Sequence, residues 1–257
     1  QGSVGTFAAR SAGAWGNSLL VATCPSANAF EATTTTSQQV DGSASAGDTT
    51  ITLDSDATSY LNVGDIIEFS STAAGVDFTT GEKYRVTALT STQVTIVQSP
   101  RGAGGLITAV VDNARMRRKW RYADQVDGTP GTSAYASDRS GVGDEIHVVV
   151  IDEDGTVSGV PGTVLETYSK LSKASDAKSP QGEINYYPTV IQNKSNYVFW
   201  MDHNSSGTNW GNAAAGTTYT AVDTPTTESL SGGADGSAAT DGQLKSAYEK
   251  FNDADTV

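Results

Sequence analysis

The chain has 257 residues, which is enough for one or two domains with a sizeable hydrophobic core. Its formal net charge of -13 argues against general binding to nucleic-acid phosphates or to anionic membranes, and we expect neither as a partner. The single cysteine, Cys24, excludes a framework of intrachain disulfides. The 27 glycines and the polar connecting stretches favour many strands and loops over a helical bundle.

The first 30 residues predict a short strand beside a tryptophan with glycines nearby. Residues 18–23 form an apolar run that ends before Pro25, and we expect Cys24 to be a small buried residue there. The glycines let the backbone pass close to the ring of Trp15, which favours a core anchor. A ligand-stacking aromatic is the alternative interpretation of Trp15.

Residues 40–112 are predicted to form a small β-rich module. The stretch 31–48 is rich in Thr, Ser, Gln and Gly and is typical of a linker or long turn. Strand patterns with Gly, Ser and Asp turns between them follow at residues 49–53, 61–69, 82–86 and 93–97. This spacing predicts a small antiparallel β-barrel or sandwich. We expect it to be inserted into a discontinuous mixed α/β body made of residues 1–39 and 113–257.

A glycine-rich segment and a basic run follow the last of these strands. Residues 101–105 lack the Lys-Ser/Thr ending and the following helix of a phosphate-binding loop, so we expect a turn. The basic run contains Arg115, Arg117, Arg118, Lys119 and Arg121. We interpret it as a subunit-contact strip that meets an acidic face, either within the chain or on a neighbouring copy. The alternative is contact with nucleic-acid phosphates, with Trp120 stacking on a base.

The stretch 143–175 predicts the centre of the body. Residues 146–151 are a nearly continuous apolar run, which favours a strand buried on both faces. Asp152 to Gly155 predict a tight turn, and residues 156–160 a returning strand. Thr163 and Glu166 have the spacing of a capping box, which predicts a helix from Thr163 onward. Its apolar face would hold Val164, Leu165, Tyr168 and Leu171.

The other connections are predicted from composition and spacing. Residues 122–142 and 173–183 are predicted loops, and 204–240 a mobile loop, because they hold few apolar anchors. Residues 189–195 predict a short helix or turn, and 244–251 a helix. Residues 197–200 predict a strand in the same sheet as 146–151.

No arrangement of residues predicts catalysis. The two histidines are His147, inside the apolar strand, and His203. Asp202 is adjacent to His203 and would point to the opposite face of a strand, so a Ser/His/Asp triad is not expected. Asp152, Glu153 and Asp154 could ligate a hard cation, but the distant Glu of a calcium loop is missing, so we favour a solvated turn. We expect no enzyme activity, no metal and no cofactor.

The predicted body contains several long motifs in a fixed order. They are AWGN at 14–17, YADQVD at 122–127, PGTSAYA at 130–136, DEIHVVVIDEDG at 144–155, PGTVLE at 161–166, NYYP at 185–188, YVFW at 197–200, and the stretch from DGQL at 241–244 to Phe251. In this order they resemble the tail sheath proteins of contractile-tailed bacteriophages, the myoviruses. The resemblance covers about residues 1–30 and 113–257, and the module at 40–112 does not share it.

The resemblance implies a virion structural protein of the phage tail, made in the cytoplasm of the host bacterium. Sheath subunits stack as rings around a tail tube and contract to drive the tube through the host envelope. The implied partners are other copies of the sheath protein, with the tail tube and baseplate contacted through regions outside this chain. Family members are larger, and this chain begins with Gln1, so we expect a piece of a longer protein.

Two other function classes stay open. A host-surface or carbohydrate-binding module of a phage tail is the alternative, since the predicted module at 40–112 could present such a face. A hydrolase would require Asp, Glu or His side chains that converge in a cleft.

Overall fold

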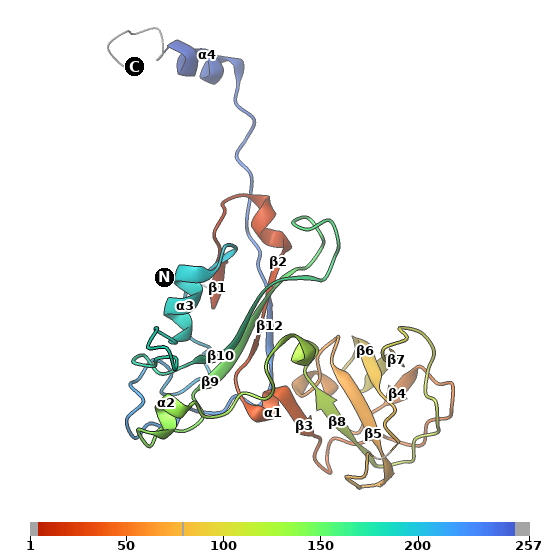
Figure 1. Cartoon of the computed structure of the whole chain (residues 1–257). Helices are drawn as coiled ribbons and strands as arrows, with labels where there is room; N and C mark the ends of the chain where they lie inside the picture. Colours follow the sequence, from red (N-terminus) through yellow and green to blue (C-terminus); the bar gives the residue numbers. More distant parts are fainter. Residues whose placement is uncertain (1–4, 79, 250–257) are drawn as a thin grey trace.

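The computed structural model describes residues 5–78 and 80–249, and its strands form three antiparallel sheets (Figure 1). The body is built on a four-stranded sheet. Its order is β10 (Thr163–Ser172), β9 (Glu145–Asp152), β2 (Leu19–Cys24) and β12 (Thr226–Ser229). The strands predicted at 18–23 and 146–151 are confirmed as β2 and β9. The sequence 204–240 contains β12, so a loop over that whole range was wrong.

Strand β9 is buried on both faces, as its apolar run predicts. Ile146, Val148 and Val150 point into one core cluster, and Val149 and Ile151 point into another on the opposite face. Alternate residues of a strand face opposite sides, so a strand between two cores must be apolar throughout. The sheet is therefore covered on both sides over β9.

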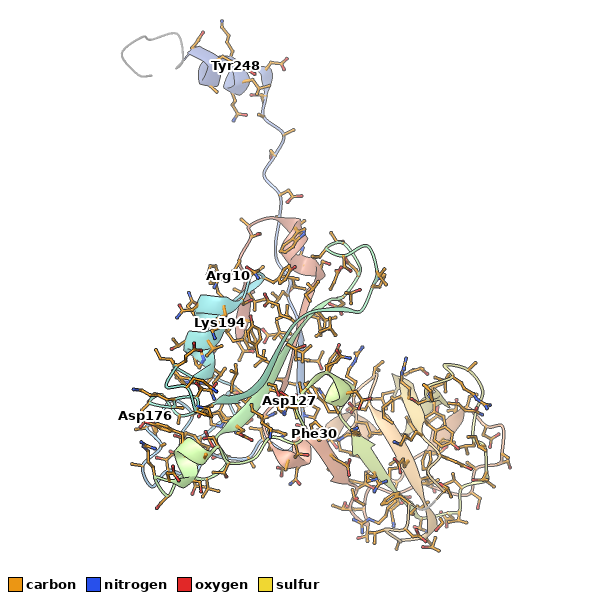
Figure 2. All side chains as sticks on the ribbon, in the orientation of Figure 1. Arg10, Phe30, Asp127, Asp176, Lys194 and Tyr248 are labelled. Carbon is orange, nitrogen blue, oxygen red and sulfur yellow. The ribbon has the colours of Figure 1, made fainter. Side chains whose placement is uncertain are left out.

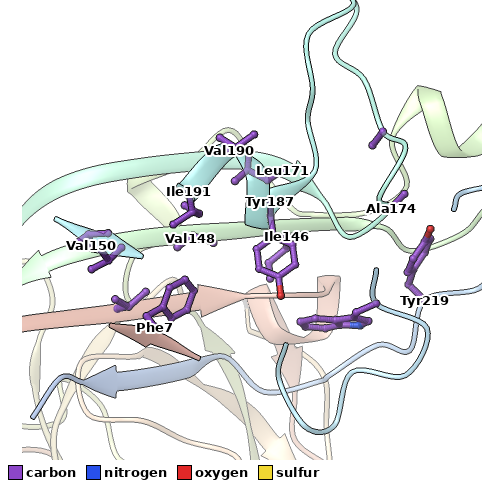
Figure 3. Close-up of a cluster of buried hydrophobic side chains, with 14 of the residues drawn as sticks. Phe7, Ile146, Val148, Val150, Leu171, Ala174, Tyr187, Val190, Ile191 and Tyr219 are labelled. Carbon is purple, nitrogen blue, oxygen red and sulfur yellow. The ribbon is translucent and has the colours of Figure 1, made fainter. Parts of the chain in front are cut away.

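The first face of the sheet is covered by helix α3 (Tyr187–Lys194) and by a two-stranded sheet of β1 (Phe7–Ala9) and β11 (Val198–Trp200). Figure 3 shows Tyr187, Val190 and Ile191 of α3 over the apolar residues of β9. The predicted helix at 189–195 is confirmed. The predicted strand at 197–200 is also confirmed, but its placement in the same sheet as β9 is wrong, because β11 pairs with β1 in a separate two-stranded sheet.

Residues 163–172 form strand β10, so the predicted capped helix is wrong. The strand pairs with β9 along its length, and its register shifts between Val164 and Glu166 and again between Tyr168 and Leu171. Each β-bulge adds a residue and breaks the two-residue alternation. Two bulges in ten residues thus gave the apolar positions a spacing that imitates a helix.

Glu166 does not cap a helix but ties β10 to α3 and β11. Its carboxylate accepts hydrogen bonds from the Ser195 hydroxyl and the Asn196 N–H, both at 2.7 Å, and from the Tyr168 hydroxyl at 3.0 Å. The contact explains why an acidic residue stands at this half-buried position of the strand.

The predicted tight turn and the returning strand at 156–160 are also wrong. Residues 153–162 form one long loop between β9 and β10, which we call the hairpin loop. The Asp152 carboxylate accepts hydrogen bonds from the N–H groups of Gly155, Val157 and Ser158 and from two serine hydroxyls. Because these backbone donors are used by Asp152, residues 156–160 do not form a strand ladder.

The second large sheet has six strands and gathers residues 31–119. Its order is β3 (Glu31–Thr33), β8 (Ala114–Lys119), β5 (Ile66–Ala73), β6 (Tyr84–Leu89), β7 (Gln93–Gln98) and β4 (Thr50–Thr52). The four strands predicted at 49–53, 61–69, 82–86 and 93–97 are confirmed as β4 to β7.

This sheet surrounds a core of its own, centred on residues such as Ile67, Tyr84 and Ile96. It is open, with β3 and β4 as its two edges, so of the two predicted forms, barrel or sandwich, the barrel is wrong for the described residues. Its outer strand β3 and its second strand β8 lie outside residues 40–112, so the sheet is wider than the predicted module. The insertion of a separate domain stays a prediction.

A third cluster joins the two large sheets. Phe30 and Trp120, from the chain entering and leaving the six-stranded sheet, pack with Val149 and Ile151 of β9. Figure 2 shows side chains around Phe30 filling the space where the two sheets meet.

The remaining elements are short or terminal. The 3-10 helices are Ala14–Ser18, Ala57–Ser59 and Ala123–Gln125, and the short α-helices are α1 (Ala27–Phe30) and α2 (Ala134–Ser137). The predicted loop 122–142 therefore contains two helical turns. Helix α4 (Asp241–Glu249) supports the predicted C-terminal helix, although Phe251 lies outside the described residues.

Helix α4 buries none of its residues and lies at the end of an extended segment, away from both sheets (Figure 1). In the described part of the chain, no helix combines the length and apolar character needed to cross a membrane.

The role of Glu166 is tested by replacing it with alanine. Loss of its carboxylate leaves three donors without their acceptor, so we expect Glu166→Ala to lower the free energy of unfolding by about 1–3 kcal/mol. Glu183→Ala is the matched control, because Glu183 is 72% exposed in a 3.6 Å pair with Lys194 and should cost less than about 1 kcal/mol. Urea unfolding followed by circular dichroism measures both; equal effects would contradict this role of Glu166.

Candidate subunit-contact surface

The basic run lies mainly on strand β8, and the strand divides it between two faces. Residues of β8 alternate between buried and half-buried, so Arg115, Arg117 and Lys119 share one face while Arg118 points to the other. Arg121 follows the strand and is exposed. The five cations therefore do not form one continuous strip.

Arg118 is buried, with only 3% of its surface exposed. Its guanidinium donates hydrogen bonds to the carbonyl oxygens of Asn28, Ala29 (2.8 Å) and Asp223 (3.5 Å). The side chain belongs to the six-stranded sheet, and these carbonyls belong to segments that flank β2 and β12 of the body. Arg118 is therefore an internal link between the two sheets and is not available to a second copy.

The other four cations also contact their own chain. Arg117 pairs with Glu68 at 2.6 Å and lies over the Phe78 ring at 4.8 Å, and Lys119 pairs with Asp124 at 3.0 Å. Arg115 donates to the Thr34 carbonyl. Arg121 donates to the Val63 carbonyl at 3.3 Å and lies over the Tyr122 ring at 4.7 Å. The strip was predicted to meet an acidic face either within the chain or on a neighbouring copy. Acidic partners within the chain are present at Glu68 and Asp124.

Asp65 lies in the same junction and is fully buried. Burial raises the pKa of its carboxyl to about 6, against the lowering influence of Arg118 and Arg121. Sequence analysis missed this residue because a turn of the form Asn-Val-Gly-Asp does not reveal that the carboxyl will face an interior junction.

His147 is an uncharged core residue. Its Nδ1 accepts a hydrogen bond from the Lys170 N–H at 3.0 Å, and its Nε2 lies 2.9 Å from the Gly128 carbonyl oxygen. The ring stacks on Trp120 at a centroid distance of 6.3 Å. Burial lowers the pKa of His147 to about 4. The residue supports the core and presents no free nitrogen to a substrate.

His203 is held in a group of aromatic rings. Its ring nitrogens lie 2.7 Å from the Tyr187 hydroxyl and 3.3 Å from the Tyr186 hydroxyl, and its centroid lies 5.1 Å from that of Trp200. Asp202 contacts the His203 backbone N–H. The structure therefore gives His203 phenol partners and does not assemble a triad with Asp202.

The remaining candidate residues contribute to the fold. Cys24 is buried and burial raises its pKa to about 12, which matches an unreactive thiol. Trp15 stacks on Tyr197 at a centroid distance of 6.1 Å and packs on the main core. Residues 101–105 form a turn with no helix after it.

Asp152 to Asp154 do not form a cation site with other ligands. Within residues 5–78 and 80–249, no group of three or more His, Cys, Asp or Glu side chains could hold a metal ion. Hydrogen bonds from Ser158 and Ser18 keep the pKa of Asp152 well below its usual value despite its burial. Asp152 is therefore the charged anchor of the hairpin loop.

Lys173 is a buried residue in a segment predicted to be a polar loop. Its ammonium donates to the carbonyls of Pro25 (2.7 Å) and Gly143 (2.8 Å) and lies 5.0 Å from the Trp210 ring centroid. Burial lowers its pKa to about 8. Sequence reasoning missed it because a Ser- and Ala-flanked lysine resembles a surface residue.

Comparison with known proteins adds no family to these observations. No model of a protein family matches the chain, and no curated protein shows significant similarity to it.

The link made by Arg118 is tested by Arg118→Met, which keeps much of the volume and removes the donors. We expect a loss of about 3 kcal/mol in the free energy of unfolding, because one buried and two partly buried carbonyl groups lose a charged partner. Lys119→Met on the same strand is the control and should cost less than about 1 kcal/mol, since Asp124 is 88% exposed. A loss for Arg118→Met as small as that of the control would refute the link.

The state of His147 predicts how stability depends on pH. Its pKa in the folded protein, about 4, lies below the value of about 6.5 in the unfolded chain, so the unfolded state takes up the proton first as the pH falls. The preference of the folded state for neutral His147 stabilises the protein fully above pH 6.5. This contribution to the free energy of unfolding, roughly 3 kcal/mol, is lost between pH 6.5 and 4.

The measurement compares wild type with His147→Gln, which cannot titrate. We expect the difference between their free energies of unfolding to shrink as the pH falls from 7 to 4. A difference that stays constant over this range would show that His147 is not kept neutral by the fold.

Proposed function

We propose that this chain is part of a subunit of a contractile phage tail sheath, without enzyme activity and without a cofactor. Other copies of the same protein are its main partners. The tail tube and baseplate would be contacted by parts of the subunit outside this chain, and the protein would reside in the virion tail. Contraction requires rigid bodies whose mutual contacts have two discrete arrangements of different energy.

The observation that carries the proposal is the place of the resembling motifs. Most of them lie on the four-stranded sheet or on the layers packed against it: residues 144–155 include β9, 161–166 begin β10, and 185–188 and 197–200 belong to α3 and β11. None lies in residues 40–112. The motifs thus belong largely to one continuous core, as expected if they were kept together as a structural body.

The exposed C-terminal helix also supports an assembling protein. Leu244 and Tyr248 are one helical turn apart on α4 and are 46% and 72% exposed. Figure 2 shows Tyr248 far from the body. An apolar helix face without a core of its own gains stability by packing on a further protein surface.

The proposal predicts that the complete protein forms ordered cylinders. Electron microscopy of the purified complete protein should show tubes with a regular axial repeat. The 257-residue chain alone should be monomeric by light scattering, because the regions expected to bind the tube and neighbours lie outside it.

Failure to form any ordered cylinder across a range of salt and protein concentrations would overturn the proposal. Binding of the whole chain to a glycan array through residues 31–119 would instead favour the host-surface alternative. Turnover of a small molecule or polymer by the chain would favour a hydrolase.

A further inference from the structure

We propose that the hairpin loop of one copy docks into a groove at the opposite end of the β9–β10 hairpin in a second copy. This inference rests on the proposed function, since it names one contact through which sheath subunits would meet.

The hairpin loop is more ordered than a simple connection between strands. Its two ends meet at the paired residues Asp152 and Thr163, so residues 153–162 form a compact Ω-like loop. Asp152 holds its backbone from inside, and Gly155, Gly159 and Gly162 take positive φ values that allow its tight path. A surface loop held in one conformation loses little entropy on binding.

The loop presents an exposed apolar pair and two exposed acids. Val160 is 61% exposed and is followed by the exposed Pro161. Glu153 and Asp154 are exposed beside the strand ends. Hydrogen bonds from Ser18 and Thr156 lower the pKa of Asp154 and favour its charged form. The surface offered is an exposed apolar pair near one end of the loop and two negative charges at the other end.

The groove lies at the other end of the same hairpin, beside α2, and has a volume of about 630 Å³. Tyr135 and Pro180 supply apolar surface, and Arg139, Lys170 and Lys178 supply positive charge. The Arg139 guanidinium lies 3.7 Å from the Tyr135 ring centroid.

Hydrogen bonds hold the backbone of two of these cations, Lys170 and Lys178. Lys170 lies in the second bulge of β10, with its N–H bonded to His147, and Lys178 is in a β-bridge with Ile184. In the described part of the chain, neither ammonium group is within 4 Å of a carboxylate oxygen. Asp138 and Glu145 also line the groove, so its three cations exceed its carboxylates by one and leave a small positive excess. Two cations are thus available to an acidic partner.

Loop and groove complement each other and face opposite ways. The loop follows Asp152 at one end of β9, and the groove includes Glu145 at the other end, about 23 Å away at about 3.3 Å per residue. A loop cannot reach the groove of its own chain, so the occupant we infer is a second copy. Contacts between two different surfaces of identical subunits are head-to-tail and generate rings or open helical polymers.

The contact sets orientation more than affinity. A stable dimer buries about 800 Å² of surface on each partner. The hairpin loop alone does not supply that area. Exposed charges of opposite sign guide encounter and register at little net gain in affinity. The contact is therefore compatible with a monomeric chain at low concentration and becomes populated when other surfaces hold copies together.

The experiment crosslinks two chains that each carry one new cysteine. A Val160→Cys chain with a mass tag is mixed at high concentration with an untagged Ser179→Cys chain, where Ser179 lines the groove between Lys178 and Pro180. Cys24 does not interfere, because it is fully buried. After mild oxidation, we expect the mixed dimer on a non-reducing gel at several times the yield of a control pair.

The control pair uses Val76→Cys in place of Ser179→Cys, since Val76 is 65% exposed but lies in the part of the chain that forms the six-stranded sheet. Glu153→Lys in the tagged chain should reduce the mixed dimer toward the control yield. Adding Lys178→Glu to the untagged chain should restore it. Equal yields for both pairs, or a charge reversal without effect, would overturn the docking.

This outcome is separable from the outcome for the proposed function. Cylinders of the complete protein without loop-to-groove crosslinks would overturn the docking alone. Crosslinks with no cylinder under any condition would leave the contact in place and overturn the sheath assignment.

Discussion

The burial of β9 on both faces is the constraint on which the structure depends. Its even-numbered residues, such as Val148, face the core under α3, while Val149 and Ile151 face the junction with the six-stranded sheet. A single strand thus joins two hydrophobic cores, and a cavity made at one of its residues would weaken the core which that residue faces. Trp120 and Phe30 extend that junction into the second sheet.

Buried polar groups define how the pieces around β9 are oriented. Arg118 binds body carbonyls from the six-stranded sheet, Asp152 organises the hairpin loop, and Glu166 ties β10 to the start of β11. Each contact gives a charged group hydrogen-bond partners from a segment distant in the fold or in the loop it holds. Apolar burial brings these segments together, and the charged groups select one geometry.

A body with this internal order suits a role in which work is done between copies. The hairpin joins an ordered loop at one end to a charged groove at the other. Because β9 and β10 are paired along their length, the two surfaces keep a constant separation. Repeated contacts between such surfaces would follow the strand direction.

The sequence alone determined β9 from its continuous apolar run, β2 from its apolar run, and β4 to β7 of the six-stranded sheet from short strand patterns between turns, but it did not predict β3 or β8 of that sheet. Prediction from the sequence failed at β10, because two bulges changed the spacing of the apolar residues and Glu166 had the spacing of a helix cap. It also grouped Arg115 to Arg121 as one strip, although β8 turns Arg118 inward. Pairing partners, bulges and buried charges depend on residues far apart in the chain, so only the tertiary structure decided them.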